Sequence, residues 1–128
     1  MNHNLILWVL QWAFGLFFVG FGVLHFMVPE GLPAILDWMY DLDPTLHYVT
    51  GAAEMLGGLG LILPGLTGVM PGLTPWAAVG LAAVMVGAMI FHASRGEIIN
   101  IVLNVVDGGI MVYIAYGRWR PAPLRARI

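Results

Sequence analysis

Residues 5–27 read LILWVLQWAFGLFFVGFGVLHFM, a run without any Asp, Glu, Lys or Arg. A transmembrane helix needs roughly 20 mainly apolar residues to cross a hydrocarbon core of about 30 Å. Residues 45–63, 75–92 and 98–116 form three more mainly apolar runs, the first interrupted only by Glu54 and the last only by Asp107. Because the bilayer core offers no water to the backbone, only helices or closed barrels span it, and barrel strands need only about 9–11 residues. The sequence therefore predicts an all-α integral membrane four-helix bundle, one domain over residues 1–128 with a tail at 117–128.

The overall composition supports a membrane location and excludes several function classes. The chain has 128 residues, of which 60% are hydrophobic and 9% are charged, whereas soluble domains carry about 25% charged residues. The net charge is −2 and lysine is absent, which excludes the clustered basic surface of a nucleic-acid partner. Cysteine is absent as well. Any redox chemistry would therefore need a bound cofactor or a partner protein.

The segments between the runs contain residues that begin and end helices. Asp43 is expected to cap the second helix, with Pro44 at its first position. Pro64 and Gly65 are expected to end that helix, and Gly117 is expected to end the fourth. Pro71, Gly72 and Pro75 frame the start of the third helix.

The first loop is the longest, and its residues 33–40 predict a short helix at the membrane interface. Trp38 and Tyr40 are expected at headgroup depth, where aromatic rings are common. The charged residues of this loop are all acidic, whereas those of the tail are Arg118, Arg120, Arg125 and Arg127. Positive charge favours the cytoplasmic side. Both termini are therefore predicted to be cytoplasmic, with these arginines as topology anchors.

A few polar residues interrupt the apolar runs, and ionisable groups inside a bundle are candidates for function. On the fourth run, Asn100, Asn104 and Asp107 lie at helical spacing and form one stripe. On the second run, His47 and Glu54 lie on one face with two glycines. The candidate residues are His25, His47, Glu54, His92, Asn100, Asn104 and Asp107.

The depth of these residues suggests how they are arranged. At about 1.5 Å of rise per residue, Glu54 lies about 13 Å and Asp107 about 15 Å from the outer ends of their helices. The histidines and Asn100 lie nearer the outer surface. The sequence therefore predicts a polar funnel that opens outward, with two carboxylates near the midplane. Because two close carboxylates do not both ionise cheaply in a low dielectric, one carries a proton or they share a cation.

Structural interpretations of the same residues stay open. Asn100 and Asn104 can serve as hydrogen-bonding links between helices, and a histidine near a helix end, such as His47, is often only a satisfied interfacial residue. Gln11 is expected to bond a neighbouring helix. The small residues of the second and third helices are interpreted as packing positions, because they let membrane helices approach closely. They are Ala53, Gly57, Gly60, Gly80, Ala83 and Gly87.

Several motifs resemble those of the DoxX and DoxX-like membrane proteins. GFGVLHF at residues 20–26, followed by Pro29 and Glu30, resembles the end of that family's first helix. GAAEMLGGLGL at residues 51–61 resembles the second helix, and residues 75–95 with HASRGE at 92–97 resemble the third helix and its loop. The second-helix glutamate and the histidine that closes the third helix are the most specific marks.

The resemblance implies a four-helix bacterial inner-membrane protein. The family takes its name from a subunit of a thiosulfate:quinone oxidoreductase, and other relatives are linked to membrane redox complexes or to the assembly of partner proteins. Glu54 and His92 match residues of the family pattern. His25 departs from it, because many relatives have a basic residue there, often lysine.

Three functions are compatible with these features. The first is a small subunit of a membrane redox system that binds a quinone-like or other lipophilic ligand, with His25, His47, Asn100 and Asn104 as ligand-binding residues. In this hypothesis Glu54, Asp107 and His92 exchange protons, and a partner protein supplies the electrons. The second is a non-catalytic assembly module, and the third is proton-coupled transport of a small solute by a homo-oligomer. A divalent metal on histidines and carboxylates is favoured less, because the spacing supports it weakly. Whether the chain catalyses a reaction is left open.

Overall fold

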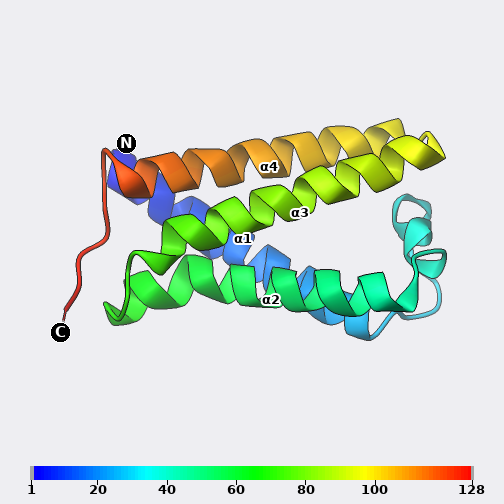
Figure 1. Ribbon diagram of the computed structural model, residues 1–128, viewed down its shortest axis with the longest axis horizontal. Coiled ribbons are helices and arrows are strands. Elements are labelled where there is room, and N and C mark those ends of the chain that lie inside the picture. Colours follow the sequence, from blue (N-terminus) through cyan, green and yellow to red (C-terminus); the bar gives the residue numbers. More distant parts are fainter. Residues whose placement is uncertain (1, 128) are drawn as a thin grey trace.

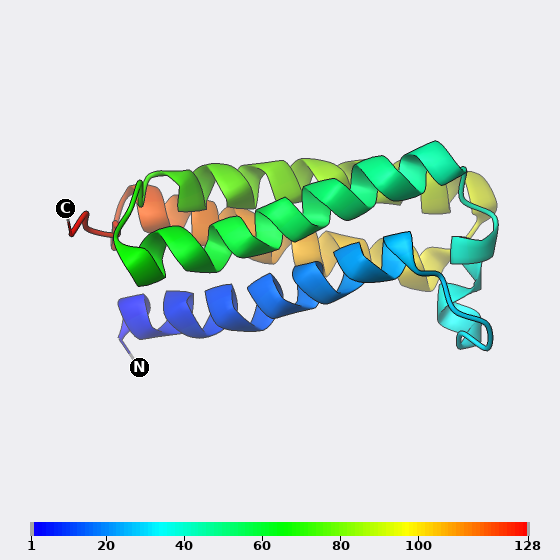
Figure 2. The ribbon, with the colours of Figure 1, turned by 90° about the horizontal axis from the view of Figure 1, so that it is seen from below.

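The structure, a computed structural model, describes residues 2–127 as a bundle of four long helices. They are α1 (His3–Phe26), α2 (Pro44–Thr67), α3 (Leu73–Arg95) and α4 (Ile98–Trp119), and a short 3-10 helix, η1 (Ala34–Tyr40), lies in the first loop. Successive long helices run in opposite directions, and both termini lie at one end (Figure 1). The view from below places η1 at the other end (Figure 2). The predicted four-helix membrane bundle is confirmed.

The outer faces of all four long helices are apolar and exposed. Each helix is long and apolar enough to cross a membrane, and examples of its outward side chains are Leu16, Leu56, Ile90 and Val112, which are 60–71% exposed. In water so much apolar surface would be strongly unfavourable, whereas lipid tails accommodate it. The chain is a multi-pass membrane protein.

Glycines bring α1 and α2 into close contact. A Cβ at Gly58 would lie 2.5 Å from the carbonyl oxygen of Gly15, and a Cβ at Gly22 would lie 2.7 Å from that of Gly51. Both distances exclude a side chain, so the two backbones touch at two levels. α3 packs along α4 in the same extensive way, whereas α1 and α4 contact each other little. The bundle is therefore built from two helix pairs.

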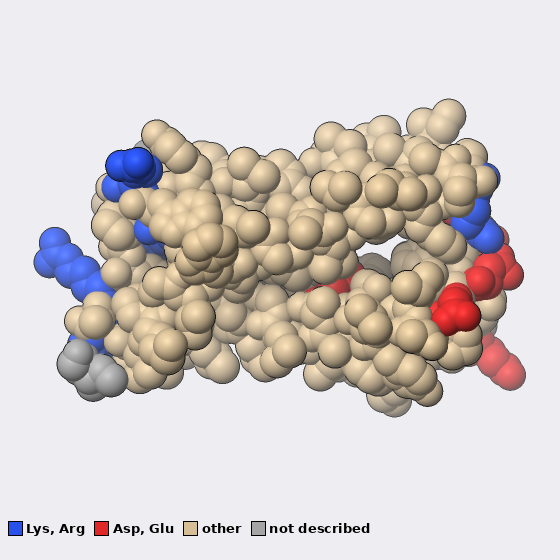
Figure 3. Space-filling view, in the orientation of Figure 1, with Lys and Arg blue, Asp and Glu red and all other residues tan. Residues whose placement is uncertain are grey.

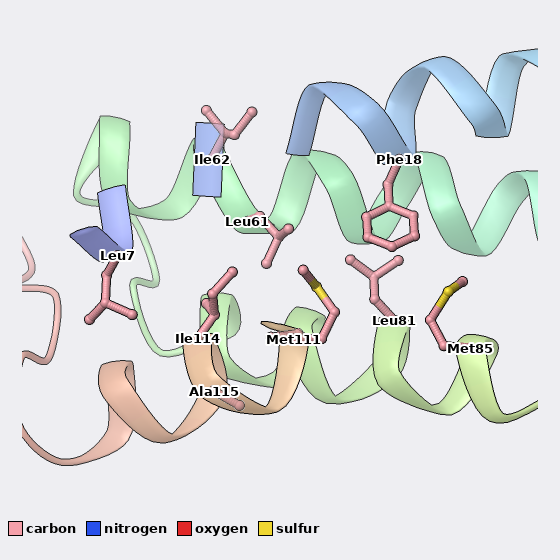
Figure 4. Close-up of a cluster of buried hydrophobic side chains, with 10 residues drawn as sticks. Leu7, Phe18, Leu61, Ile62, Leu81, Met85, Met111, Ile114 and Ala115 are labelled. Atoms are coloured by element: carbon pink, nitrogen blue, oxygen red, sulfur yellow. The ribbon is translucent and has the colours of Figure 1, made fainter. Parts of the chain in front are cut away.

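An apolar cluster fills the bundle from the end with the termini to the middle. Leu7 and Ile114 lie toward that end, and Phe18 and Met85 lie toward the middle (Figure 4). These side chains are almost fully buried. Beyond Phe18 and Met85 the helices enclose a cavity, since both residues also line it.

Polar groups tie three helices together at the end with the termini. Arg118 of α4 donates from Nε to Oε1 of Gln11 (2.5 Å), and Gln11 donates from Nε2 to the carbonyl oxygen of Leu61 (2.6 Å). Arg118 also donates to Asn4 and Ala122 and lies over the Trp8 ring. The prediction for Gln11 is confirmed. Arg118, predicted as one of the topology anchors, is 3% exposed and links α4 to α1.

Two predicted helix ends are wrong, because both residues lie inside their helices and face another helix. Pro64 lies inside α2, which ends only at Gly68 with a φ of 73°. Proline frees the carbonyl four residues earlier, which is that of Gly60, and Thr74 of α3 donates its hydroxyl to this oxygen (2.9 Å). Gly117 lies inside α4, where a Cβ would meet Leu7 at 2.7 Å.

The small residues of α2 and α3 behave differently. A Cβ at Gly57 or Gly60 would collide with α3, as the packing interpretation predicts. A Cβ at Gly80 or Gly87 would meet nothing within 4 Å. The interpretation of these two glycines as packing positions within the bundle is therefore wrong, because that side of α3 faces outward.

The cap of α2 and the short helix agree with prediction. Asp43 accepts a hydrogen bond from the backbone N–H of Thr45 (2.8 Å), with Pro44 at the first helical position. α3 begins at Leu73, directly after Gly72. η1 occupies residues within the predicted 33–40. The loop geometry can therefore be understood largely from local sequence.

Replacing Thr74 by Val is expected to lower the free energy of unfolding by about 1 kcal/mol, because the Gly60 carbonyl then has no donor. In a Pro64→Ala background the same change should cost much less, since the alanine introduced there would supply the helical N–H. Thermal or denaturant unfolding in detergent of the four variants measures this coupling. Equal costs in both backgrounds would show that Thr74 does not compensate for Pro64.

Candidate functional site

A cavity of about 320 Å³ lies between the four helices in the half of the bundle away from the termini. This volume falls in the range of small-molecule sites, about 300–1,000 Å³. Most of its lining is apolar and includes the Phe18, Phe21 and Phe91 rings. Six of the seven polar residues singled out in the sequence line it: His25, Glu54, His92, Asn100, Asn104 and Asp107.

The seventh residue, His47, lies behind His25. The two Nδ1 atoms are 2.8 Å apart, and His47 Nε2 is 2.7 Å from the carbonyl oxygen of Met39 in η1. His25 Nε2 in turn lies 3.6 Å from Glu54 Oε2. A chain of polar groups therefore connects η1 to the carboxyl group in the cavity.

The partners in this chain determine which nitrogen atoms carry hydrogen. A carbonyl oxygen only accepts, so His47 Nε2 donates to Met39. Neutral His47 then accepts at Nδ1, and His25 donates from its own Nδ1. His25 Nε2 is left facing Glu54 Oε2. Because two bare lone pairs would repel each other, one proton belongs on one of these two atoms.

Three buried polar atoms near the cavity have no hydrogen-bond partner within residues 2–127: Trp38 Nε1, Glu54 Oε2 and Asn104 Nδ2. Their residues all line the cavity. Buried polar groups in proteins are nearly always bonded, and an exception calls for an explanation such as a ligand. Two of these atoms are N–H donors, and the third is a carboxyl oxygen.

Trp38, predicted at headgroup depth, turns toward the cavity. Its ring is half-buried, with its centroid 5.9 Å from that of His25 and 5.0 Å from that of His92. The Trp38 ring therefore lies between His25 and His92 and contacts both. A tryptophan in an interfacial loop is usually a lipid anchor, and only the fold shows that this one turns inward.

The predicted funnel is wrong in two respects. The end of the cavity is covered by the first loop, because Leu36, Trp38 and Leu42 are among its lining residues. The hollow visible in Figure 3 lies instead at the side, between α2 and α3, with acidic residues beside it. The lining is also mainly apolar rather than a row of polar groups. The spacing of polar residues indicated their common face but not the aromatic rings that other helices contribute.

An ionic network holds the first loop against α3. Arg95 donates from Nη2 to Asp41 Oδ2 (2.9 Å) and from Nε to Glu97 Oε1 (2.7 Å). His92 Nδ1 lies 3.1 Å from the same Glu97 oxygen. His92 is therefore oriented by Glu97, and Asp41 ties the end of η1 to α3.

No group of three or more His, Asp or Glu residues within residues 2–127 is arranged to hold a metal ion. Both nitrogen atoms of His47 and the Nδ1 atom of His25 are engaged in bonds to each other or to Met39, and His25 Nε2 faces Glu54. The cavity is mainly apolar and has a few polar side chains in its lining.

A family model for the DoxX-like family matches residues 9–114. The chain belongs to the DoxX-like family. The resemblance based on the sequence motifs is thereby confirmed. The matched range of the DoxX-like model includes all seven predicted site residues, whereas Arg118 lies beyond it. No curated protein and no solved structure matches the chain.

Sequence reasoning missed Trp38 and the phenylalanines of the cavity in this DoxX-like protein. A signal for the latter existed, because Phe18, Phe21 and His25 lie at spacings of three and four on α1 and hence on one face. No comparable signal existed for Trp38, whose direction depends on the path of the first loop.

The ionic network predicts a pH-dependent stability. The pKa of Glu97 is lowered from 4.5, because partial burial raises it but hydrogen bonds from Arg95 and His92 lower it more. A lowered carboxyl pKa stabilises the folded state above the unfolded value and loses this effect as pH falls through the folded value. Glu97→Gln should therefore reduce the melting temperature at about pH 7, and the difference from the wild type should shrink as the pH falls through the lowered pKa of Glu97.

The matched control is Glu30→Gln, which makes the same chemical change at an exposed loop residue. It should show little difference from the wild type at neutral or at acid pH. A gap between wild type and Glu97→Gln that persists at acid pH would mean that the charge of Glu97 is not what stabilises this end.

Proposed function

We propose that this protein binds a quinone-like or other lipophilic carbonyl ligand in the cavity, as a small subunit of a membrane redox system. One observation carries the proposal: Trp38 Nε1, Asn104 Nδ2 and Glu54 Oε2 are buried without a hydrogen-bond partner among residues 2–127, beside the same cavity, and the nearest polar atom recorded for Glu54 Oε2 is His25 Nε2 at 3.6 Å. Two of them are N–H donors, which require acceptors. A quinone ring offers two carbonyl oxygens and an apolar face for the surrounding phenylalanines.

The polar residues suit the proton chemistry of such a ligand. Reduction of a quinone to a hydroquinone consumes two electrons and two protons, and the electrons would come from a partner protein. Glu54 and Asp107 line the cavity, and in this proposal they exchange protons with the ligand, together with His92. His25 and His47 extend the chain from Glu54 to Met39 in η1. His47 thus acts through His25 and does not touch the ligand.

The proposed location is the bacterial inner membrane with both termini in the cytoplasm. Arg120 and Arg125 are exposed at the end with the termini, and the acidic residues of the first loop gather at the opposite end (Figure 3). Positive charge near span ends favours the cytoplasmic side. With this orientation the cavity lies in the outer half of the bilayer.

A second candidate function is an assembly module for another membrane protein. It is favoured by the outward-facing glycines of α3, Gly80 and Gly87, which leave open space on that helix. Small residues let another membrane helix approach closely. In this alternative the protein would co-purify with a specific partner and bind no quinone.

Titration with a benzoquinone analogue tests the proposed function. Trp38 is the tryptophan among the cavity-lining residues, so ligand binding should quench its fluorescence in a saturable way. Glu54→Gln should raise the Kd up to about tenfold, because it removes the acidic O–H that a protonated Glu54 donates to a ligand carbonyl, and a neutral hydrogen bond contributes about 0.5–1.5 kcal/mol. Glu30→Gln is the matched control.

Quenching of exposed tryptophans such as Trp76 and Trp119 by quinone dissolved in detergent or lipid should not saturate. Trp38→Phe separates the two components, because it removes the saturable one alone. If wild type and Glu54→Gln give the same non-saturating curve, the ligand-binding function is contradicted and the assembly module is favoured.

A further inference from the structure

The cavity has an opening toward the bilayer rather than toward water. The first loop covers the end of the cavity, where Arg95 and Asp41 hold it against α3. Figure 3 shows the hollow at the side, between α2 and α3. Leu46 and Val49 of α2 line the cavity and are still 49% and 60% exposed, so they lie at its mouth.

The edges of this α2–α3 opening combine small side chains with apolar ones. Gly87 and Ala88 of α3 and Ala53 of α2 all line the cavity. Gly87 is exposed, and a Cβ there would meet nothing within 4 Å. The opposite seam, between α1 and α4, carries the bulky side chains of Phe17 and Leu103. The α1–α4 seam has fewer helix contacts, and these two side chains are 40% and 47% exposed. The α2–α3 side is therefore distinguished by its small residues and not by greater space.

The polar atoms of the site lie deep in the cavity, and the apolar side chains lie at its opening toward the lipid. The unpartnered atoms of Trp38, Glu54 and Asn104 are buried, whereas the mouth is edged by Leu46, Val49 and Gly87. A molecule that satisfies both parts has a polar head and an apolar extension. A small water-soluble molecule would satisfy only the inner part.

We propose that the ligand is a membrane-dissolved amphiphile that enters between α2 and α3 and leaves its apolar tail in this opening, with its carbonyl-bearing head in the cavity. This inference rests on the proposed ligand-binding function and adds the class of ligand and its route. It assigns Gly87 as the residue whose lack of a side chain keeps the route open.

The test compares two probes, a dimethoxy-methyl-benzoquinone with a decyl tail and the same ring without the tail. Binding to the wild-type protein in nanodiscs is followed by the saturable quenching of Trp38, with concentrations expressed per lipid. The tailed probe should bind more tightly. Gly87→Phe should raise the Kd of the tailed probe about tenfold and leave that of the short probe within about twofold.

Gly80→Phe is the matched control. Gly80 lies two turns earlier on the same outward side of α3, also in open space, and does not line the cavity. This variant should bind both probes as the wild type does. If Gly87→Phe keeps the full preference for the tailed probe, or if the wild type shows no such preference while binding the short ring, the route is overturned and the proposed function stands. If the wild type binds neither probe, both are overturned.

A spin label gives a second measurement that does not depend on an aromatic substitution. Because the chain has no cysteine, Gly87→Cys and Gly80→Cys can each be labelled at a single site. The tailed probe should reduce the mobility of the label at position 87, the short probe should not, and neither should affect position 80. Equal mobility at position 87 with and without the tailed probe would overturn the inference.

Discussion

The structure depends on one constraint: a polar atom inside the bilayer core finds no water and must be bonded within the protein. Pro64 leaves the carbonyl oxygen of Gly60 on α2 without its helical donor, and this oxygen accepts a hydrogen bond from the Thr74 hydroxyl of α3. The buried guanidinium of Arg118 meets Gln11 and Asn4. Each of these hydrogen bonds joins two different helices. The bonds that pair buried polar groups therefore also determine which helices pack together.

The same constraint separates the bundle into two halves with different roles. Near the termini, apolar side chains such as Leu7 and Ile114 fill the interior. In the other half the α1–α2 pair and the α3–α4 pair enclose a cavity, and there Trp38, Glu54 and Asn104 keep buried atoms without partners among residues 2–127. Two more such atoms, His3 Nε2 and Arg118 Nη2, lie near the termini, so the cavity differs in that three of them belong to residues that line one space.

The periodicity of apolar and polar residues was sufficient to predict the spans and the polar face of α4. It also placed Glu54 and Asp107 on a common cavity, since both lie deep on faces turned inward. It failed wherever a contact from a distant segment outweighs a local preference, as at Pro64, which Thr74 compensates. The direction of Trp38 could not be predicted either, because it follows from the path of a loop.

The most direct test of the central claim is the chemical identity of what the cavity holds in the cell. Wild-type protein and Asn104→Leu would be purified in mild detergent from the same membranes, and their organic extracts compared by mass spectrometry. The account predicts a carbonyl-bearing, long-tailed molecule that is enriched with the wild type and depleted with the variant. Extracts that both match the bulk membrane lipids would contradict it.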